Sequence, residues 1–394
     1  MYNPLLFDTS TKGVCLSDVT LILLGAGSSS RFDSSVKKQW LYSAEQPLWL
    51  QVARHFETLH PFAKIIIVSS AEDIRFMPYF ADYTYVVGGD SRQASLTNAL
   101  TEVQSRYVLV SDIARACVPA DMVARILAAK EEAACIVPAL SATDTLYMDD
   151  LPLDREKVRI IQTPQLSVTE TLKKSLKSNK TFTDDSSAIA ALGEQIHFVQ
   201  GDQRAHKLTT VADLEKLPCL QPPSKRTMSG FGLDIHPFEP GKPMVLGGVA
   251  IDSEVGFKAH SDGDVAIHAL IDALLGAAGM GDIGELYPDT DAAYKGADSK
   301  VLLQDTVSRV RSHGFEIGNV DLTILAEAPR INPYKLQIRK ILASLLQLPM
   351  QRVNIKATTA EKLGFVGRKE GVTVHAVATL HYFDWTKLIS GQTS

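Results

Sequence analysis

The sequence predicts an α/β domain with a mostly parallel sheet, followed by a separate α+β domain. The first half alternates short apolar runs with longer amphipathic runs, and the second half mixes both kinds without strict alternation. Between them, residues 218–230 are rich in Pro, Ser and basic side chains, which is typical of a linker. A chain of 394 residues also exceeds the usual size of one domain. We therefore expect domains at 1–217 and 229–394, joined by a linker at 218–228.

In the first half, continuous apolar runs indicate strands that are buried on both faces. We expect strands at 19–27, 64–70, 83–89, 107–112 and 134–140, and helices at 47–59 and 120–133. Strands of this kind, alternating with helices, favour a parallel sheet covered by helices, as in Rossmann-like folds.

The second half has a different pattern of apolar residues. Apolar strand-like runs lie at 230–238, 244–251, 319–327, 352–358 and 371–383, and helical patterns follow His260 and occupy 299–313 and 333–346. Because strands and helices are mixed rather than alternating, an α+β arrangement is expected.

Composition narrows the class of protein. The hydrophobic fraction of 45% and the charged fraction of 22% are ordinary for a globular chain, and the formal net charge is −5. Without a basic patch, nucleic acid is not an expected partner. The N-terminus lacks the pattern of a signal peptide, and no run of about 20 apolar residues could span a membrane. We expect a cytoplasmic enzyme with no membrane partner.

The cysteines predict neither a disulfide framework nor a zinc site. Cys15, Cys117, Cys135 and Cys219 are widely separated, and no two have the spacing of a CxxC motif. A reducing compartment fits this pattern.

A candidate metal site is formed by GFGLDIHPF (230–238) and HSDGDVAIHALIDALLG (260–276). On a strand, Asp234 and His236 point to the same face, and His268 lies in the body of the following helix. These three side chains would leave one position of a zinc ion open, as in catalytic sites. His260 precedes the helix, where an anion is favoured, and Asp262 is the expected N-cap. Spacing alone equally allows a surface Asp–His pair and a packed core histidine.

These motifs resemble 2-C-methyl-D-erythritol 2,4-cyclodiphosphate synthase. The resemblance covers 229–383 and includes GFKAHSDGDVAIHALIDALLGAAGMGDIGELYPD, GNVDLTILAEAPRI and NIKATTAEKLGFVGRKEG. It implies that Asp234, His236 and His268 bind zinc, and that the domain forms trimers with active sites between subunits.

The resemblance also implies roles for further residues. Those expected to contact the phosphates and the methylerythritol are His260, Ser261, Asp282, Gly284, Asp289, Phe365 and Arg368. Those expected around the cytidine diphosphate are Ala326, Ala328, Pro329, Arg330, Ile331, Thr358 and Thr359, with His260 and Thr359 in catalytic roles. Glu361 is expected to bind a second metal ion, Mg²⁺ or Mn²⁺.

In the first half, the expected strand at 19–27 runs into the Gly/Ser-rich stretch GAGSSSR, and Arg31 and Lys38 follow at a seven-residue spacing. Two cations beside such a loop favour a triphosphate site. The stretch is neither GxGxxG nor a P-loop, so a flexible turn remains an equal interpretation.

This half resembles the cytidylyltransferase that makes 4-diphosphocytidyl-2-C-methyl-D-erythritol from CTP, over 18–216. The matching stretches are GAGSSSR with KKQW, GGDSRQASLTNAL, LVSDIARACV, LDREKVRIIQTPQ, TDDSSA and AHKLT. Ser29 replaces a glycine and Lys37 a proline of the family pattern. The resemblance implies catalytic roles for Arg31, Lys38, Arg155 and Lys207, and nucleotide contacts from Gly27, Gly88, Gly89, Arg92, Ser95 and Asp112. Asp112 would also bind Mg²⁺ or Mn²⁺.

Together the two resemblances imply a bifunctional enzyme of the non-mevalonate isoprenoid pathway. One reaction transfers CMP from CTP to 2-C-methyl-D-erythritol 4-phosphate, and the other forms the cyclic diphosphate and releases CMP. A trimeric second half and a dimeric first half would build a homo-oligomer such as a hexamer.

Two alternatives remain open at this point. The lost glycine and proline allow a first half that only binds nucleotide or directs assembly. The metal set also allows a zinc phosphohydrolase that cleaves diphosphates to linear products.

Overall fold

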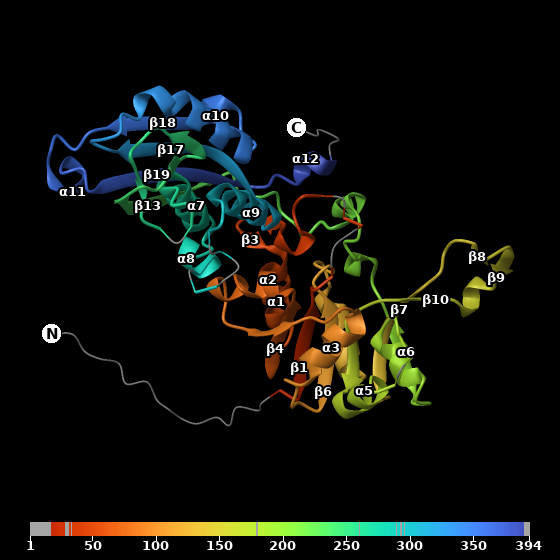
Figure 1. The fold of residues 1–394 in the computed structure, drawn as a ribbon. Helices are drawn as coiled ribbons and strands as arrows, with labels where there is room; N and C mark the ends of the chain where they lie inside the picture. Colours follow the sequence, from red (N-terminus) through yellow and green to blue (C-terminus); the bar gives the residue numbers. More distant parts are fainter. Residues whose placement is uncertain are drawn as a thin grey trace, which may run out of the picture. The chain divides into compact units, whose positions relative to one another are not determined.

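The computed structural model describes residues 17–27, 31–32, 34–178, 180–259, 261–288, 290–291, 294 and 296–389. These form two compact units (Figure 1). Unit 1 comprises the described residues of Met1–Ser28, Trp49–Leu208 and Lys216–Cys219. Unit 2 comprises those of Ser29–Leu48, Thr209–Glu215 and Leu220–Ser394.

Unit 1 is built around one large sheet with the strand order β10-β7-β11-β6-β1-β4-β5, and β12 pairs with β7. Its strands are β1 (Val19–Leu24), β4 (Lys64–Ser69), β5 (Thr84–Val87), β6 (Tyr107–Asp112), β7 (Cys135–Ser141), β8 (Leu146–Met148), β9 (Leu151–Leu153), β10 (Arg159–Ile161), β11 (Gln165–Val168) and β12 (Ile196–Gln200). Its α-helices are α1 (Leu48–Leu59), α2 (Ala71–Ile74), α3 (Arg92–Leu100), α4 (Ala120–Ala128), α5 (Thr169–Ser175) and α6 (Asp185–Ala190). Short 3-10 turns lie at Met77–Tyr79, Arg155–Lys157 and Gln203–Ala205.

The sheet of unit 1 is mixed, with a parallel core. β1 pairs in parallel with β4 and β6, and β4 pairs in parallel with β5. β11, however, runs antiparallel to both β6 and β7, and β10 runs antiparallel to β7. Since β7 and β12 run in the same direction as β6, the expectation of a mostly parallel sheet holds, and the two reversed strands β10 and β11 make the sheet mixed.

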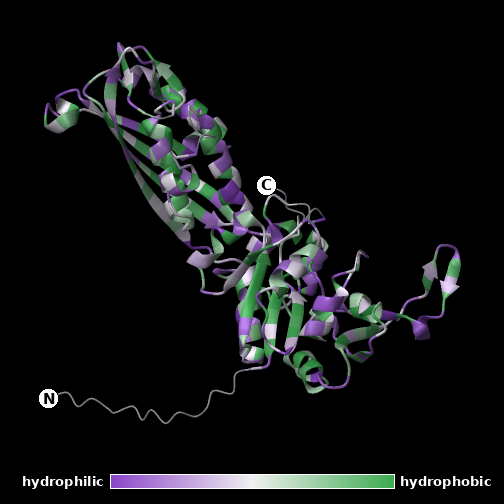
Figure 2. Cartoon of the chain, turned by 60° about the horizontal axis from the view of Figure 1, so that its bottom comes forward, coloured by the Kyte–Doolittle hydropathy of each residue, from purple (hydrophilic) through white to green (hydrophobic). Residues whose placement is uncertain are grey.

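The central strands of unit 1 are buried on both faces. All six residues of β1 and of β6 are buried, as expected for continuous apolar runs. Their side chains join Leu96, Leu100 and Leu172 in one core cluster. Figure 2 shows these strands as hydrophobic along most of their length.

A hairpin of β8 and β9 extends away from this sheet (Figure 1). Its apolar side chains Tyr147, Met148 and Leu151 are exposed.

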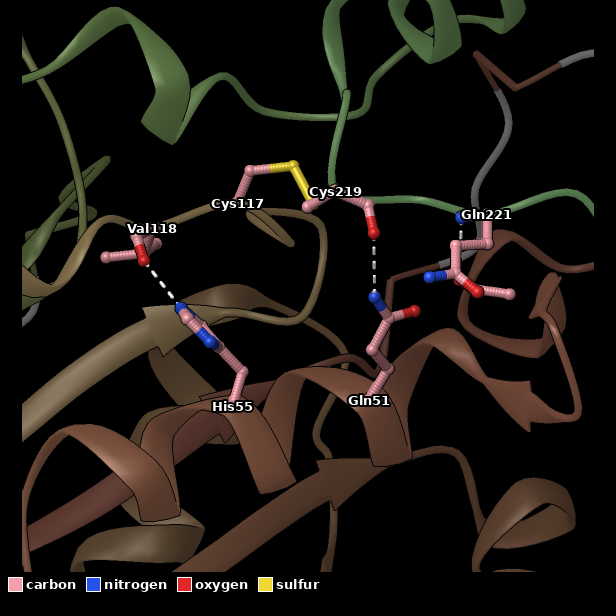
Figure 3. The surroundings of a disulfide bond; sticks show 7 residues. Gln51, His55, Cys117, Val118, Cys219 and Gln221 are labelled. Atoms are coloured by element: carbon pink, nitrogen blue, oxygen red, sulfur yellow. Dashed lines mark hydrogen bonds between the residues drawn. A yellow bond between two sulfur atoms is a disulfide. The ribbon is translucent and has the colours of Figure 1, made fainter.

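A disulfide joins Cys117 to Cys219, 102 residues apart, with 5.7 Å between their Cα atoms (Figure 3). The expectation that the cysteines form no disulfide was wrong. Spacing rules detect local motifs, whereas this pair is brought together by the path of the chain through unit 1. The carbonyl oxygen of Cys219 accepts a hydrogen bond from Gln51 on α1, and His55 on the same helix bonds the carbonyl oxygen of Val118.

Unit 2 contains a five-stranded sheet with the order β16-β13-β19-β17-β18. Its strands are β2 (Tyr42–Ser43), β3 (Gln46–Pro47), β13 (Thr227–Pro240), β14 (Met244–Leu246), β15 (Val249–Ile251), β16 (Val255–Phe257), β17 (Phe315–Leu325), β18 (Val353–Thr358) and β19 (Gly371–Tyr382). Its helices are α7 (Val265–Ala278), α8 (Ile283–Leu286), α9 (Ser299–Ser312), α10 (Lys335–Leu345), α11 (Gly364–Gly367) and α12 (Thr386–Ile389). Further 3-10 turns lie at Lys38–Trp40, Val211–Lys216, Asn332–Tyr334 and Met350–Arg352. The expected α+β arrangement is confirmed.

The two faces of β13 differ. Gly230 and Gly232 lie against the backbone of α7, where an added Cβ atom would come within 2.1 Å of Ala273 O and 1.9 Å of Ala269 O. The residues between and after them, Phe231, Leu233 and Ile235, point the opposite way and are 61%, 45% and 46% exposed. One face of the sheet therefore packs on α7, and the other presents an apolar surface.

α7 is a buried helix that is apolar on nearly every side, as a helix inside a core should be. Its N-cap is Asp264, whose side chain accepts hydrogen bonds from the backbone of Ala266, Ile267, Gly247 and Gly248. The expectation that Asp262 caps this helix was therefore wrong. The helix starts two residues later, and the Asp262 carboxylate binds Ser299 at the start of α9.

The Ser29–Leu48 segment packs within unit 2. The ring of Tyr42 stacks on Tyr382 at 4.3 Å between centroids, and Trp385 donates a hydrogen bond from Nε1 to Tyr42 O. Trp40 lies against His313 at 4.6 Å. A segment that precedes α1 in sequence thus contributes to the aromatic core beside β17 and β19.

Among the described helices, none combines the length and the apolar character needed to cross a membrane.

Candidate active sites

The fold brings Asp234, His236 and His268 together, and their ligand atoms lie within 4.8 Å of one another. Asp234 and His236 point to the α7 side of β13, where His268 projects from the first turns of that helix. Asp234 Oδ2 lies 3.3 Å from His268 Nδ1 and 3.6 Å from His236 Nδ1. The glycines at 230 and 232 allow this close approach of helix and strand.

The chemistry of this cluster fits a divalent metal ion. Asp234 Oδ2 and His236 Nδ1 are buried and make no hydrogen bond of normal geometry within the described part of the chain. Burial lowers the pKa of His236, so its imidazole stays neutral and able to bind a metal. Burial alone would lower the pKa of His268, but the neighbouring Asp234 carboxylate outweighs it and raises that pKa. The carboxylate thus favours a positive charge beside it, whether from a proton or from a metal ion.

The hydroxyl groups of two serines orient the ring of His268. Its Nε2 lies 2.9 Å from Ser299 Oγ and 3.4 Å from Ser261 Oγ, while Nδ1 faces Asp234. Ser299 Oγ in turn donates to Asp262. Such outer contacts fix the ring of a metal-binding histidine. The expected substrate contacts His260 and Asp289 lie outside the described residues.

Asp282 and Gly284 lie at the short helix α8. The Asp282 side chain caps this helix by accepting from Glu285 N at 2.8 Å. Asp272 of α7 accepts from Ile283 N at 2.8 Å and ties α8 to α7. The Asp282 side chain therefore has a structural task in addition to the expected substrate contact.

The expected cytidine side forms from two loops after β17 and β18. Ala326 N bonds Thr358 O, and the Glu327 carboxylate accepts from Ala360 N, so the two loops lie side by side. The first loop continues through Ala328, Pro329, Arg330 and Ile331, and its Ala328–Pro329 peptide is cis. In the second, Thr359 Oγ1 donates to Glu361 Oε1 at 2.7 Å.

Phe365 and Arg368 lie on and just after α11. Phe365 is partly exposed, and Arg368 forms a two-pronged ion pair with Glu370. This pair raises the pKa of Arg368 and keeps its guanidinium charged.

Sheet register relates the two ends of this unit. Asp234 pairs with Val374, Val374 with Ile324, and Ile324 with Ala357. Three strand spacings separate Asp234 from Ala357, or about 14 Å. The metal-binding cluster and the loops at 326–331 and 358–361 are therefore distinct regions of one chain.

Unit 1 contains a pocket of about 470 Å³. It is lined by Arg92, Asp112, Arg115, Ile161, Gln162, Thr163, Gln165, Thr183, Asp184, Ser186, Ser187, Ala190, Ile196, Phe198 and Lys207. Three cationic side chains in this wall, from Arg92, Arg115 and Lys207, favour an anionic ligand.

Asp112, at the end of β6, is the centre of this pocket's network. Its Oδ2 accepts from Lys207 Nζ at 3.0 Å and from Thr163 Oγ1 at 3.1 Å. Arg115 Nε donates to Thr163 Oγ1 at 2.8 Å. Burial would raise the pKa of Asp112, but Lys207 and Arg92 outweigh it and lower that pKa, so the carboxylate stays ionised.

The Gly88–Gly89 pair precedes α3 and contacts Ser95 in the first turns of that helix. Ser95 Oγ accepts from Gly89 N at 3.1 Å. A Cβ atom at Gly88 would lie 2.3 Å from Ala26 Cβ, and one at Gly89 would lie 2.6 Å from Ala94 Cβ. Both glycines are thus required by close packing, beside whatever nucleotide contact they make.

Seven expected residues are not among those lining the pocket: Gly27, Arg31, Lys38, Gly88, Gly89, Ser95 and Arg155. Gly27 follows β1, and Arg31 and Lys38 belong to the segment grouped with unit 2. Arg155 is exposed near the β8–β9 hairpin, where it donates to Thr143 O at 3.1 Å. Sequence reasoning underrated Arg115, Thr163 and Gln165, although the retained Arg in DIARAC and the TPQ stretch were visible signals.

Comparison with known proteins gives two family matches. Residues 19–217 match 2-C-methyl-D-erythritol 4-phosphate cytidylyltransferase, and residues 227–381 match the YgbB family.

Relatives span nearly the whole chain. The bifunctional enzyme IspD/IspF of Sulfurovum sp. is 69% identical, over 94% of this chain and 99% of its own length. That of Sulfurimonas denitrificans is 55% identical, over 98% and 100%. The solved structure of bifunctional IspDF from Campylobacter jejuni is 47% identical and superposes with a TM-score of 0.84, over 94% of this chain and 100% of its own.

Proposed function

Because the chain belongs to the bifunctional IspD/IspF enzymes of the methylerythritol phosphate pathway, with cytidylyltransferase and cyclodiphosphate synthase activities, we propose that each activity has its own cluster of side chains. The pocket around Asp112 serves cytidylyl transfer, and the cluster around Asp234 serves cyclisation. The observation that supports this division most strongly is the set of three adjacent ligand atoms in unit 2, separate from the cationic pocket in unit 1.

In cytidylyl transfer, a phosphate oxygen of 2-C-methyl-D-erythritol 4-phosphate attacks the α-phosphorus of CTP, and pyrophosphate leaves. Negative charge grows on the α-phosphoryl oxygens in the transition state. Lys207 and Arg115 are positioned by Asp112 and Thr163 to offset that charge, and Arg92 extends the cationic wall. Arg31, Lys38 and Arg155 complete the proposed set, and Gly27, Gly88, Gly89 and Ser95 lie along the proposed nucleotide path.

In cyclisation, the 2-phosphate of 4-diphosphocytidyl-2-C-methyl-D-erythritol 2-phosphate attacks its own β-phosphorus, and CMP leaves. Two anionic groups must approach each other, so positioning and charge neutralisation are the main demands. Asp234, His236 and His268 hold the phosphate end, with His260, Ser261, Asp282, Gly284 and Asp289 beside it. The loops at 326–331 and 358–361 hold the cytidine end, with Phe365 and Arg368 near the substrate.

We assign Zn²⁺ to Asp234, His236 and His268, and Mg²⁺ or Mn²⁺ to Glu361 and to Asp112. When bound, these ions would supply positive charge to the phosphates. The two buried, unpartnered ligand atoms support the first assignment within the described residues. The donor types Asp and His suit zinc.

We further propose a homo-oligomer, with a trimer through unit 2 and additional pairing through the β8–β9 hairpin that makes a hexamer. Two features support it. Phe231, Leu233 and Ile235 form an exposed apolar surface on β13, and Tyr147, Met148 and Leu151 form another on the hairpin.

Phosphorus NMR of the purified chain tests both activities. With CTP, 2-C-methyl-D-erythritol 4-phosphate and Mg²⁺, we expect pyrophosphate and a new cytidine diphosphate pair. With the phosphorylated diphosphocytidyl substrate, we expect a cyclic diphosphate and CMP. A linear product that contains solvent ¹⁸O would instead identify a phosphohydrolase. Unchanged CTP would mean that the first half only binds nucleotide or directs assembly.

A further inference from the structure

Behind the pocket of unit 1 lies a buried acid that the reaction scheme does not use. Asp185 opens α6 and is 0% exposed, and its Oδ1 accepts a hydrogen bond from Arg92 Nη1 at 2.7 Å. Arg92 lines the pocket, whereas Asp185 does not. The carboxylate therefore contacts the guanidinium from the side away from any ligand.

The pair is incompletely satisfied. Within the described part of the chain, Asp185 Oδ2 and Arg92 Nη2 are both buried and have no hydrogen-bond partner. A buried ion pair contributes little net stability even when it is fully hydrogen-bonded, and unpaired atoms make it more costly. Fold stability is thus a poor explanation for this arrangement.

The neighbouring acid behaves differently. Asp184 is the N-cap of α6 and accepts from Ser187 N, Gln165 Nε2 and Ser186 Oγ. Its hydrogen-bonding capacity is used locally, so the cap does not need Asp185. Among the described residues, the Asp185 side chain forms its hydrogen bond and its ion pair with Arg92.

We infer that Asp185 is a positioning residue for cytidylyl transfer: it holds the Arg92 guanidinium in the pocket wall so that its positive charge faces a phosphate group of the nucleoside triphosphate. This inference rests on the proposed function of the pocket. The side chain of Arg92 is 27% exposed and lies at the start of α3, directly after the Gly88–Gly89 turn. Without a fixed partner, a long guanidinium side chain samples several rotamers and loses part of its binding energy to ordering.

The test measures CTP binding by calorimetry, in the presence of Mg²⁺, for the full-length chain and three variants. Asp185→Asn keeps the size of the side chain but removes its charge. Arg92→Ala removes the donor, and the double variant removes both. We expect Asp185→Asn to weaken CTP binding about tenfold, and the double variant to bind no more weakly than Arg92→Ala alone. The KM for CTP should rise similarly, with kcat changed less than about threefold.

Glu131→Gln is the matched control. It makes the same acid-to-amide change in the exposed Arg106–Glu131 pair, 2.9 Å apart, and should leave CTP binding unchanged. Thermal unfolding and cyclase activity of each variant report whether the chain is folded.

Three results would overturn the inference: unchanged CTP affinity in Asp185→Asn, additive losses in the double variant, or a loss explained by unfolding. Failure of the proposed function has a separate signature. A wild-type chain that releases no pyrophosphate disproves the transferase assignment, while calorimetry still decides whether Asp185 acts on nucleotide binding through Arg92.

Discussion

The two large sheets differ in what covers them. In unit 1, β1 and β6 are buried along their whole length, whereas in unit 2 alternate residues of β13 (Phe231, Leu233 and Ile235) and Val377 of β19 are exposed and apolar. Phe231 of β13 pairs directly with Val377 of β19, so the exposed apolar residues form a continuous surface. Both faces of the first sheet are covered by other elements of the same chain along β1 and β6. The second is covered by α7 on one face, and its other face is the one through which we propose that copies of the chain associate.

The candidate sites differ in the same way. The pocket in unit 1 contains an ionic network in which Asp112, Lys207, Thr163 and Arg115 lie at hydrogen-bond distance from one another. In unit 2, the metal-binding cluster and the loops at 326–331 and 358–361 lie along one sheet, three strands apart. Substitutions in unit 1 should therefore act within a chain, and those on the sheet face of unit 2 should act through assembly.

The largest expected effect is on assembly. Leu233→Glu introduces a charge at the centre of the exposed apolar face, so copies should no longer associate through it. We expect light scattering to show a smaller species and cyclase activity to fall at least about hundredfold, because a site completed by a neighbouring chain is lost.

Val301→Glu is the control for that change. Val301 is an apolar residue on α9 that is 59% exposed, against 45% for Leu233, and it should tolerate the charge. If both variants assemble and cyclise normally, the apolar face has no role in association.

The next largest effect is expected on stability, through the packing of the described residues of Ser29–Leu48 in unit 2. Tyr42→Ala removes a buried ring that stacks on Tyr382 and should lower the free energy of unfolding by about 4 kcal/mol. Tyr42→Phe is the matched control. The Tyr42 hydroxyl is buried and has no hydrogen-bond partner in the described ranges, so its removal should be neutral or stabilising by about 1 kcal/mol. Chemical denaturation measures both, and equal losses in the two variants would contradict this account.

A slightly smaller effect tests the covered face of the same sheet. Asp264→Ala removes the α7 cap and leaves the amides of Gly247 and Gly248 without their acceptor. We expect a loss of about 3 kcal/mol in unfolding free energy, from the cap together with the buried amides. Asp262→Ala, two residues earlier, should cost less because Asp262 caps no helix turn of α7. A larger loss of unfolding free energy for Asp262→Ala than for Asp264→Ala would mean that the N-cap at Asp264 is not the main stabilising contact at the start of α7.

Much of this arrangement could be predicted from the sequence. Continuous apolar runs located β1, β4, β5, β6 and β7. Spacing offered Asp234, His236 and His268 as a candidate cluster, the family resemblance selected it, and the structure brings the three side chains together. Local patterns such as these depend on helix and strand periodicity alone.

The rest depends on contacts between distant parts of the chain. Nothing in the spacing of Cys117 and Cys219 indicates that they meet, and nothing near Tyr42 indicates that it packs with Phe315 and Tyr382. The cap of α7 was misassigned because Asp262 and Asp264 are both good N-cap residues, and only the position of the Gly247–Gly248 amides distinguishes them.

The smallest expected effect is a pH dependence in the pocket of unit 1. The pKa of Asp112 lies below its ordinary value of 3.8 because Lys207 and Arg92 outweigh its burial. The pair with Lys207 therefore stabilises the fold at pH values above 3.8, and this contribution is lost as the pH falls below 3.8 through the pKa of the folded state. Lys207→Met should lower the unfolding temperature by a few degrees near neutral pH. This difference in unfolding temperature from the wild type should disappear at acidic pH. Lys64→Met, which removes the partner of Glu102 in an exposed pair, should show little difference at any pH. A gap between Lys207→Met and the wild type that stays constant from pH 7 to pH 3 would mean that lost packing of the lysine stem, rather than the charge pair with Asp112, is responsible.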